Sequence, residues 1–554
     1  MIADASCRRI GDKVIQICAS LIDVDGQVQE RCLAIESYWQ AARLQLDLLK
    51  RVESALDNEL CRVIDEQLLQ LSQKLSLADA ALEKISKKSG SNRRRFWGLG
   101  AKTKKVSWAW KKDALDRIIS DLDTWHRRFD PLWFMVTNTN NPLVDDALVG
   151  ARSAHAHRSI AHGSPSVAED PLTVAAGMRR ALYPTANGLK SKFLTGVQME
   201  TSEIPFSGAK NGFIGSERRW YIIDTVQVGS WAEAEVVSKD VSMLAAKLAQ
   251  ADPLAFGLLN CEGVIPVQSK SMGLPTSSLG PSFLTSRPNY SSFQLVFRVP
   301  ENLSVLRSLR QLLLNSDEHI SLSRKMLIAR ELAKAIHYVH TFAFVHKNVR
   351  PESILCFENA ASSHSHAFLI GFDAFRSAGG GTIMAGDIGW ERNVYRHPSR
   401  QGYDPTEKYR MEHDIYSLGV CLLEIGLWET FVEYTTGEEG DFERPRARVG
   451  KTFHHFEEWF AEKRTGAGQG SIAPTFDALK LGLKDYLVEQ AKTRLAPRMG
   501  DRYAQVVLAC LTCLDEESEN FGEPDSEMED VGEDRVAICF AEKILSDLDQ
   551  LSMI

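Results

Sequence analysis

Two short stretches hold residue types with which this chain could do chemistry. The first is a loop over 344–353 with His346, Asn348 and Ser353, and the second is Gly371-Phe372-Asp373. Proton transfer needs a basic group, and binding a magnesium ion needs oxygen ligands. The amide of Asn348 takes up no proton near neutral pH, and the hydroxyl of Ser353 is a poor magnesium ligand. The glycine of the second stretch offers no side-chain oxygen.

Periodic segments on both sides position these two stretches. Apolar residues recur at helical spacing over 326–339, directly before the loop. Short strand-like runs follow over 354–357 and 367–370, and the second of them ends at Gly371. The sequence therefore predicts the order helix, loop, strand, loop, strand, with both polar stretches at the ends of elements.

This order, with its two polar stretches, resembles the core of a protein kinase, whose signatures are H-R-D-L-x-x-x-N and D-F-G. The resemblance implies that Asn348 stands in place of the catalytic aspartate, and that Ser353 and Gly371 stand in place of the metal ligands. Asp373 lies two residues beyond the missing acid, so its Cα is about 6–7 Å further along an extended chain. The resemblance thus implies a pseudokinase with degenerate positions at His346, Asn348, Ser353 and Gly371-Phe372-Asp373. We expect no catalytic residue, no metal and no cofactor, with weak ATP binding as the alternative.

A further segment supports the resemblance and predicts a structural role. His413-Asp414-Ile415-Tyr416-Ser417-Leu418-Gly419 is similar to the kinase motif D-x-Y-S-x-G. An acid within an apolar helix is expected to accept backbone N–H bonds, since a buried carboxylate needs donors. We therefore expect Asp414 and Gly419 to be structural. The resemblance covers roughly 323–551, within a predicted large lobe over 301–554.

The predicted small lobe, over 188–300, resembles the kinase pattern only in pieces. The run over 220–226 is typical of the strand that normally carries a lysine, but its most prominent polar residue is Asp224. No G-x-G-x-x-G precedes this run. The nucleotide-binding residues of the family are therefore absent together.

The N-terminal part is predicted to be an all-α helical bundle over 1–137, because apolar residues repeat every three or four positions. Within it, the segment over 84–112 holds eleven Lys or Arg and no acid, interleaved with aromatic residues. A solvated loop, an anionic membrane surface and an acidic partner such as RNA are the alternatives. The residues of this basic-aromatic segment that would make the contacts are Arg93, Arg94, Arg95, Trp97, Lys104, Lys105, Trp108 and Trp110.

Two other segments change in composition. Residues 138–187 are rich in Asn, Ser, His, Gly and Pro, which predicts a flexible linker. Residues 515–534 hold eleven acids and no base, so we expect an acidic insert that is either solvated or a partner for the basic-aromatic segment.

Composition sets broader limits. The 554 residues should form more than one domain, and the formal net charge of −8 makes nucleic acid an unlikely main partner. The scattered cysteines are typical of buried thiols in a reducing compartment, and no signal peptide or membrane span is visible. The sequence predicts a cytoplasmic protein, with peripheral attachment to membranes as the alternative.

The bundle, with Val106-Ser107-Trp108-Ala109-Trp110-Lys111-Lys112 leading into its last long helix, resembles the helical N-terminal domains of fungal HeLo-type and related prion-inhibition-and-propagation proteins. The kinase-like part is similar to C-terminal domains found in many fungal proteins. These resemblances imply a role in incompatibility or cell-death signalling, with protein partners or self-association through the bundle.

The sequence thus predicts a multidomain chain, an all-α bundle followed by an α+β bilobal kinase-like fold. The first hypothesis for its function is a pseudokinase switch that controls the bundle. The second is an atypical ATP-binding Ser/Thr protein kinase that uses Asp373, and the third is a non-enzymatic scaffold.

Overall fold

A computed structural model describes most of the chain. The described residues are 3–21, 26–92, 101–139, 141–148, 179, 193–194, 199–214, 219–228, 231–249, 251–268, 290–315, 320–359, 365–377, 389–435, 446–465, 476–516, 518, 521 and 532–551. The chain divides into two compact units, Met1–Leu182 and Tyr183–Ile554. Among the described residues, no helix combines the length and apolar character needed to cross a bilayer.

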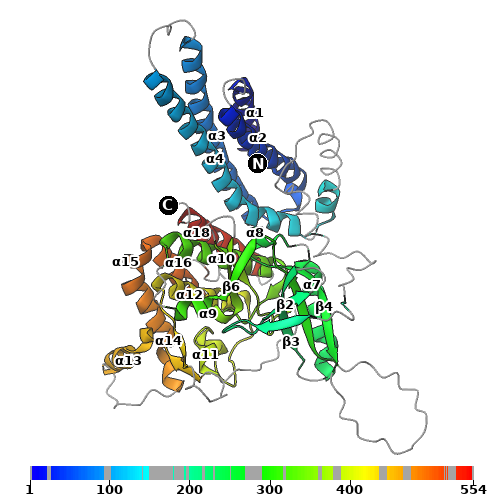
Figure 1. Ribbon diagram of the computed structural model, residues 1–554, viewed down its shortest axis with the longest axis vertical. Helices are drawn as coiled ribbons and strands as arrows, with labels where there is room; N and C mark the ends of the chain where they lie inside the picture. The colour runs from blue at the N-terminus through cyan, green and yellow to red at the C-terminus, as the bar shows by residue number, and fades with distance from the viewer. Residues whose placement is uncertain are drawn as a thin grey trace, which may run out of the picture. The chain divides into compact units, whose positions relative to one another are not determined.

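The first unit is helical (Figure 1). Helix α1 packs against α2 and α3, and α4 packs against the same two helices. Large aromatic side chains, those of Trp39, Trp125, Phe129 and Trp133, are buried in the middle of this bundle. Its elements are α1 (Ala3–Leu21), α2 (Gly26–Val52), the 3₁₀ turn η1 (Glu53–Ala55), α3 (Asn58–Asn92) and α4 (Ala101–Asn138).

The first unit extends beyond the predicted end of the bundle at 137. Residues 142–148 are helical, with Val144 and Leu148 buried. The guanidinium of Arg179 donates to both carboxylate oxygens of Asp145, at 2.5 and 2.8 Å, and to the carbonyl oxygen of Thr139 at 2.7 Å. The described parts of the expected linker over 138–187 are thus held by apolar burial and a buried arginine, which composition did not indicate.

The second unit begins with a five-stranded antiparallel sheet in the order β1-β2-β3-β5-β4. Helix α7 (Trp231–Leu248) follows β3 and packs on β4 and β5, as Figure 1 shows. The strands are β1 (Glu200–Glu203), β2 (Lys210–Ile214), β3 (Arg219–Gln227), β4 (Asn260–Gln268) and β5 (Tyr290–Arg298).

The rest of the second unit is mainly helical. A three-stranded sheet in the order β6-β8-β9 and two strand pairs, β7 with β10 and β11 with β12, lie among the helices. The strands are β6 (Leu303–Ser308), β7 (Phe344–Val345), β8 (Ile354–Asn359), β9 (Ser365–Leu369), β10 (Arg376–Ser377), β11 (Val432–Thr435) and β12 (Arg446–Val449).

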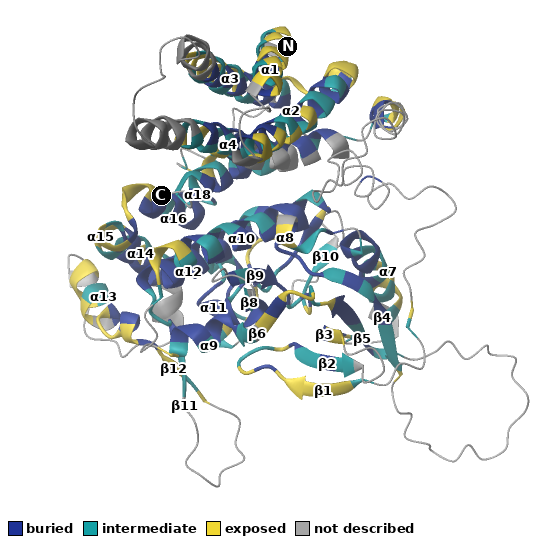
Figure 2. Cartoon of the chain, turned by 45° about the horizontal axis from the view of Figure 1, so that its top comes forward, coloured by how far each residue is buried: buried dark blue, intermediate teal, exposed yellow. Residues whose placement is uncertain are grey.

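The helices of this part are α8 (Pro253–Phe256), α9 (Leu309–Leu314), α10 (Leu322–Thr341), α11 (Trp390–Asn393), α12 (Met411–Leu427), α13 (Phe456–Thr465), α14 (Phe476–Gln490), α15 (Ala496–Met499), α16 (Asp501–Leu511), α17 (Gly532–Cys539) and α18 (Ser546–Leu551). Helix α12 is buried almost throughout (Figure 2), and α10, α15, α16 and α17 pack against it. Shorter 3₁₀ and π turns are η2 (Pro351–Ser353), η3 (Pro398–Arg400), η4 (Lys451–Phe453), η5 (Ala491–Leu495) and η7 (Phe540–Leu545).

Helix α12 can lie this deep because most of its residues after Ser417 are apolar, its buried acids Asp414 and Glu424 have hydrogen-bond partners, and a glycine faces its neighbour. A Cβ on Gly419 would lie 2.7 Å from the Cβ of Cys510 on α16, so only glycine allows the two helices to approach this closely. The predicted sequence of regions, an all-helical part followed by an α+β part, is confirmed.

Candidate functional site

The loop after α10 is anchored by one buried carboxylate from α12. Asp414 accepts the backbone N–H groups of His346 at 2.8 Å and Lys347 at 2.9 Å. It also bonds to the hydroxyl of Tyr409 at 2.6 Å and to Nε2 of His340 at 3.1 Å. Burial alone would raise the pKa of Asp414, but these donors, His340 first, lower it to about 2. A charged Asp414 therefore fixes the backbone of the loop, including Lys347 with its φ of 67°.

Asn348 uses its side-chain amide within the site. Its Nδ2 donates to the carbonyl oxygen of Gly371 at 3.1 Å and to Oδ1 of Asp373 at 2.7 Å. Its Oδ1 accepts from Nε of Arg350 at 2.7 Å. The predicted positions Asn348, Gly371 and Asp373 are thus brought together, and the amide joins them as a hydrogen-bond bridge.

Ser353 turns back toward its own loop. Its Oγ lies 2.7 Å from the carbonyl oxygen of Asn348 and 2.8 Å from that of Arg350, and it accepts the N–H of Arg350 at 3.2 Å. The serine hydroxyl has one proton and two lone pairs, so these contacts occupy most of its bonding capacity. Ser353 is buried and stabilises the 3₁₀ turn η2.

Gly371 has no room for a side chain. Its φ is 84°, a conformation that side chains disfavour. A Cβ there would lie 2.7 Å from the Cβ of Ser353 and 3.0 Å from Nδ2 of Asn348. An acid at this position would therefore require the surrounding loop to move.

Asp224 completes the site from strand β3. Its Oδ2 accepts the backbone N–H of Gly371 at 2.9 Å and that of Phe372 at 2.7 Å. The side chain is buried, and burial together with the charge of Asp373 raises its pKa to about 6, although the N–H donors act in the opposite direction. The sequence showed Asp224 only as a polar residue in an apolar strand, and its role was missed.

Nucleotide and magnesium, which the kinase resemblance implies for this place, do not fit these residues. Asp224 adds a carboxylate, and not a cation, beside Gly371 and Phe372, and its Oδ2 already accepts their N–H groups. Asn348 directs its NH₂ group, and not its oxygen, toward Asp373. Within the described ranges, no three acidic, histidine or cysteine side chains are grouped as metal ligands would be.

A second buried charge cluster was not predicted. Arg310 of α9 donates to Glu352 at 2.9 Å and to Glu424 at 3.0 Å, and it also contacts the hydroxyl of Tyr395. Burial raises the pKa of Glu352, but the charges of Arg310 and Arg350 and the hydrogen bond from Arg310 together outweigh it, so the pKa falls to about 2. At Glu424 burial dominates and raises the pKa. The signal available in the sequence was one arginine in the apolar run 309–314.

The basic-aromatic segment lies mostly outside what can be described. Arg93, Arg94, Arg95 and Trp97 fall outside the described residues. The backbone at Lys104, Lys105, Trp108 and Trp110 belongs to α4. Of the acidic insert over 515–534, the described Asp515 forms an ion pair with Lys484, and residues 522–531 lie outside the described part.

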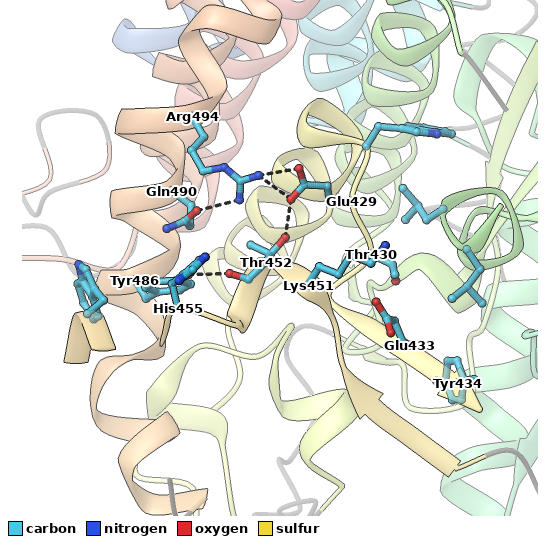
Figure 3. Close-up of a pocket in the computed structure, with 14 residues that line it drawn as sticks. Glu429, Thr430, Glu433, Tyr434, Lys451, Thr452, His455, Tyr486, Gln490 and Arg494 are labelled. Carbon is cyan, nitrogen blue, oxygen red and sulfur yellow. Dashed lines mark hydrogen bonds and ion pairs between the residues drawn. The ribbon is translucent and has the colours of Figure 1, made fainter. Parts of the chain in front are cut away.

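A separate pocket of about 810 Å³ lies beside the end of α12, and its lining is shown in Figure 3. Some of its polar residues bond to one another: Arg494 bridges both oxygens of Glu429 at 2.6 and 2.7 Å, and Thr452 donates to the same carboxylate at 2.9 Å. None of its lining residues belongs to the 346–353 loop or to 371–373. The pocket is therefore distinct from the site that the sequence predicted.

Comparison with protein-family models gives no match for this chain, and comparison with curated proteins gives none either.

Proposed function

We propose that this protein is a non-catalytic, kinase-like regulator, a pseudokinase whose conformation controls its N-terminal helical bundle. The observation that carries the proposal is the carboxylate of Asp224, which bonds to the backbone of Gly371 and Phe372 inside the site. Phosphoryl transfer needs cations around the phosphates, and here a buried anion takes their place.

Further features support a kinase-like fold for the second unit. Its sheet order with α7 after β3, the loop after α10, and the bonding of Asp414 to that loop all follow the order of the kinase resemblance. The finer assignments, a HeLo-like bundle and a role in fungal incompatibility or cell-death signalling, depend on sequence resemblance alone.

The binding of nucleotide is tested by following the thermal unfolding of the full chain with ATP, with and without magnesium. We expect the same melting temperature in all conditions, because the site offers neither a lysine on β3 nor a set of metal ligands. A rise that requires magnesium would contradict the proposal and favour the atypical kinase that uses Asp373.

Binding of the basic-aromatic segment to anionic membranes, one of the alternatives for this segment, needs its own test. The full chain would be sedimented with vesicles of phosphatidylserine and phosphatidylcholine, or of phosphatidylcholine alone. Replacement of Arg93, Arg94 and Arg95 by alanine is expected to reduce sedimentation with the anionic vesicles, since each basic residue near such a surface contributes about 1 kcal/mol. Equal sedimentation of both proteins with both vesicles would remove the membrane part and leave a scaffold for protein partners.

A further inference from the structure

Two buried cysteines lie on facing sides of the first two helices. The buried residues of α1 include Cys7, Gly11, Val14 and Cys18, and those of α2 include Val28, Cys32, Ile35 and Trp39. Both sets repeat every three or four positions, so each forms one face of its helix. The two helices lie side by side in Figures 1 and 2 and pack against each other.

The register of the two helices is fixed by Gly11 and Trp39. A Cβ on Gly11 would lie 2.4 Å from the ring of Trp39, so the ring covers the glycine directly. Helix α1 ends at Leu21 and α2 begins at Gly26, and this short connection makes the helices antiparallel.

Cys18 and Cys32 lie the same number of residues away from the contact between Gly11 and Trp39, each on its own helix. Cys18 follows Gly11 by seven residues, and Cys32 precedes Trp39 by seven. Seven residues are about two helical turns, which return to the same face about 10 Å further along each helix. Antiparallel helices in this register place Cys18 opposite Cys32.

The bonding of the two thiols agrees with this placement. The side chains of Cys18 and Cys32 hydrogen-bond to each other, which raises the pKa of Cys18 and lowers that of Cys32. Both cysteines are free and buried. Cys32 is therefore the member of the pair that more readily becomes a thiolate, the reactive form of cysteine.

We propose that Cys18 and Cys32 form an oxidisable pair that a peroxide converts into a disulfide between α1 and α2. The thiolate of Cys32 attacks one oxygen of hydrogen peroxide, the O–O bond breaks, and Cys32 becomes a sulfenic acid with release of hydroxide. The sulfur of Cys18 then attacks the Cys32 sulfur, the S–O bond breaks, and the thiol proton leaves with the hydroxyl group as water. Two thiols are oxidised and one peroxide is reduced to water.

Such a bond would join the first helix of the chain to the rest of the bundle. It closes a short loop around the connection between the helices, which restricts the unfolded chain more than the folded one. This inference concerns the first unit and does not depend on the proposed kinase-like function of the second.

The test uses the full chain, first reduced and then treated with hydrogen peroxide. Remaining thiols are alkylated, and the protein is digested without reductant for mass spectrometry. We expect peptides containing Cys18 and Cys32 to be joined, with a loss of about 2 Da for the two hydrogens removed. We also expect the oxidised chain to melt several degrees higher than the reduced chain, and a reductant to reverse both changes.

Matched variants locate the reaction. Cys18→Ala and Cys32→Ala are each expected to abolish the linked peptide, whereas Cys7→Ala, at a buried cysteine on the same helix, keeps it. The unmodified chain provides a second control, because Cys510 near the end of α16 and Cys513 in the turn that follows are also buried and lie three residues apart in the sequence. No linked Cys18–Cys32 peptide, a linkage only at other cysteines, or oxidation of Cys32 beyond the sulfenic acid without linkage would overturn the proposal.

Discussion

Two buried carboxylates in the second unit, Asp414 and Asp224, both accept backbone N–H groups, yet their pKa values move in opposite directions. Asp414 also has His340 and Tyr409 as donors, and its pKa falls to about 2. Asp224 has the charge of Asp373 nearby, and burial raises its pKa to about 6. Asp414, which anchors the loop backbone, has enough hydrogen-bond donors to offset the effect of burial on its charge. Asp224, in the candidate site, has donors that offset this effect only in part.

The largest effect is expected for Asp414→Ala. This change leaves the N–H groups of His346 and Lys347 without an acceptor in a buried place, and removal of one partner from a buried charged network costs about 3–5 kcal/mol. Urea unfolding of the variant and the parent measures the loss. The matched control is Asp373→Ala, an exposed acid whose loss should change stability by less than about 1 kcal/mol. Equal effects at the two positions would contradict the contrast between scaffold and candidate site.

The second prediction concerns the pH dependence that Asp224 causes. Its pKa is about 6 in the folded chain against 3.8 for the ordinary group, so between these values the folded state binds more protons than the unfolded state. The contribution of Asp224 to stability is therefore largest at low pH and decreases as the pH rises from about 4 to 6, by at most about 3 kcal/mol.

Asp224→Asn removes this titration. We therefore expect the unfolding free energy of the variant, compared with that of the parent, to be more favourable to the folded state at pH 7.5 than at pH 4.5. Urea unfolding of the parent and the variant at pH 4.5 and at pH 7.5 measures this change in unfolding free energy. Asp414 does not interfere in this window, because its contribution is lost only as the pH falls from 3.8 toward about 2. An identical pH dependence in parent and variant would show that Asp224 does not titrate as its burial requires.

The smallest effect comes from comparing two glycines with similar φ angles. Gly371 has a φ of 84° and Gly500 a φ of 86°, but an added Cβ meets Ser353 and Asn348 at the first and nothing within 4 Å at the second. Both alanine variants carry backbone strain, because side chains disfavour a positive φ of this size. Gly371→Ala should cost about 1–3 kcal/mol more than Gly500→Ala, because overpacking adds to the strain. Equal losses of stability for the two variants in thermal unfolding would mean that the loop around Gly371 moves aside for the added methyl group.

The order of the regions could be predicted because it depends on periodicity. The apolar repeat over 326–339 predicted a helix, and α10 covers it. The ion pair between Arg179 and Asp145, within the expected linker over 138–187, could not be predicted, because the two residues lie more than thirty positions apart.

The candidate site was predictable only in part, because some of its residues come from segments that lie far apart in the sequence. Asn348, Ser353 and Gly371-Phe372-Asp373 stand at the ends of recognisable elements, so their sequence placed them near one another. The partners Asp224 and Arg310 come from strand β3 and helix α9, and their bonds to 371–372 and to Glu424 depend on packing between distant segments.

The most direct test of the account follows transfer of the γ-phosphate from radiolabelled ATP to the full chain and to a generic protein substrate, with magnesium or manganese. The account predicts no transfer above background for either the parent or Asp373→Ala, since Asn348 cannot accept a proton and Asp224 opposes the phosphates. Metal-dependent transfer by the parent that Asp373→Ala abolishes would contradict it.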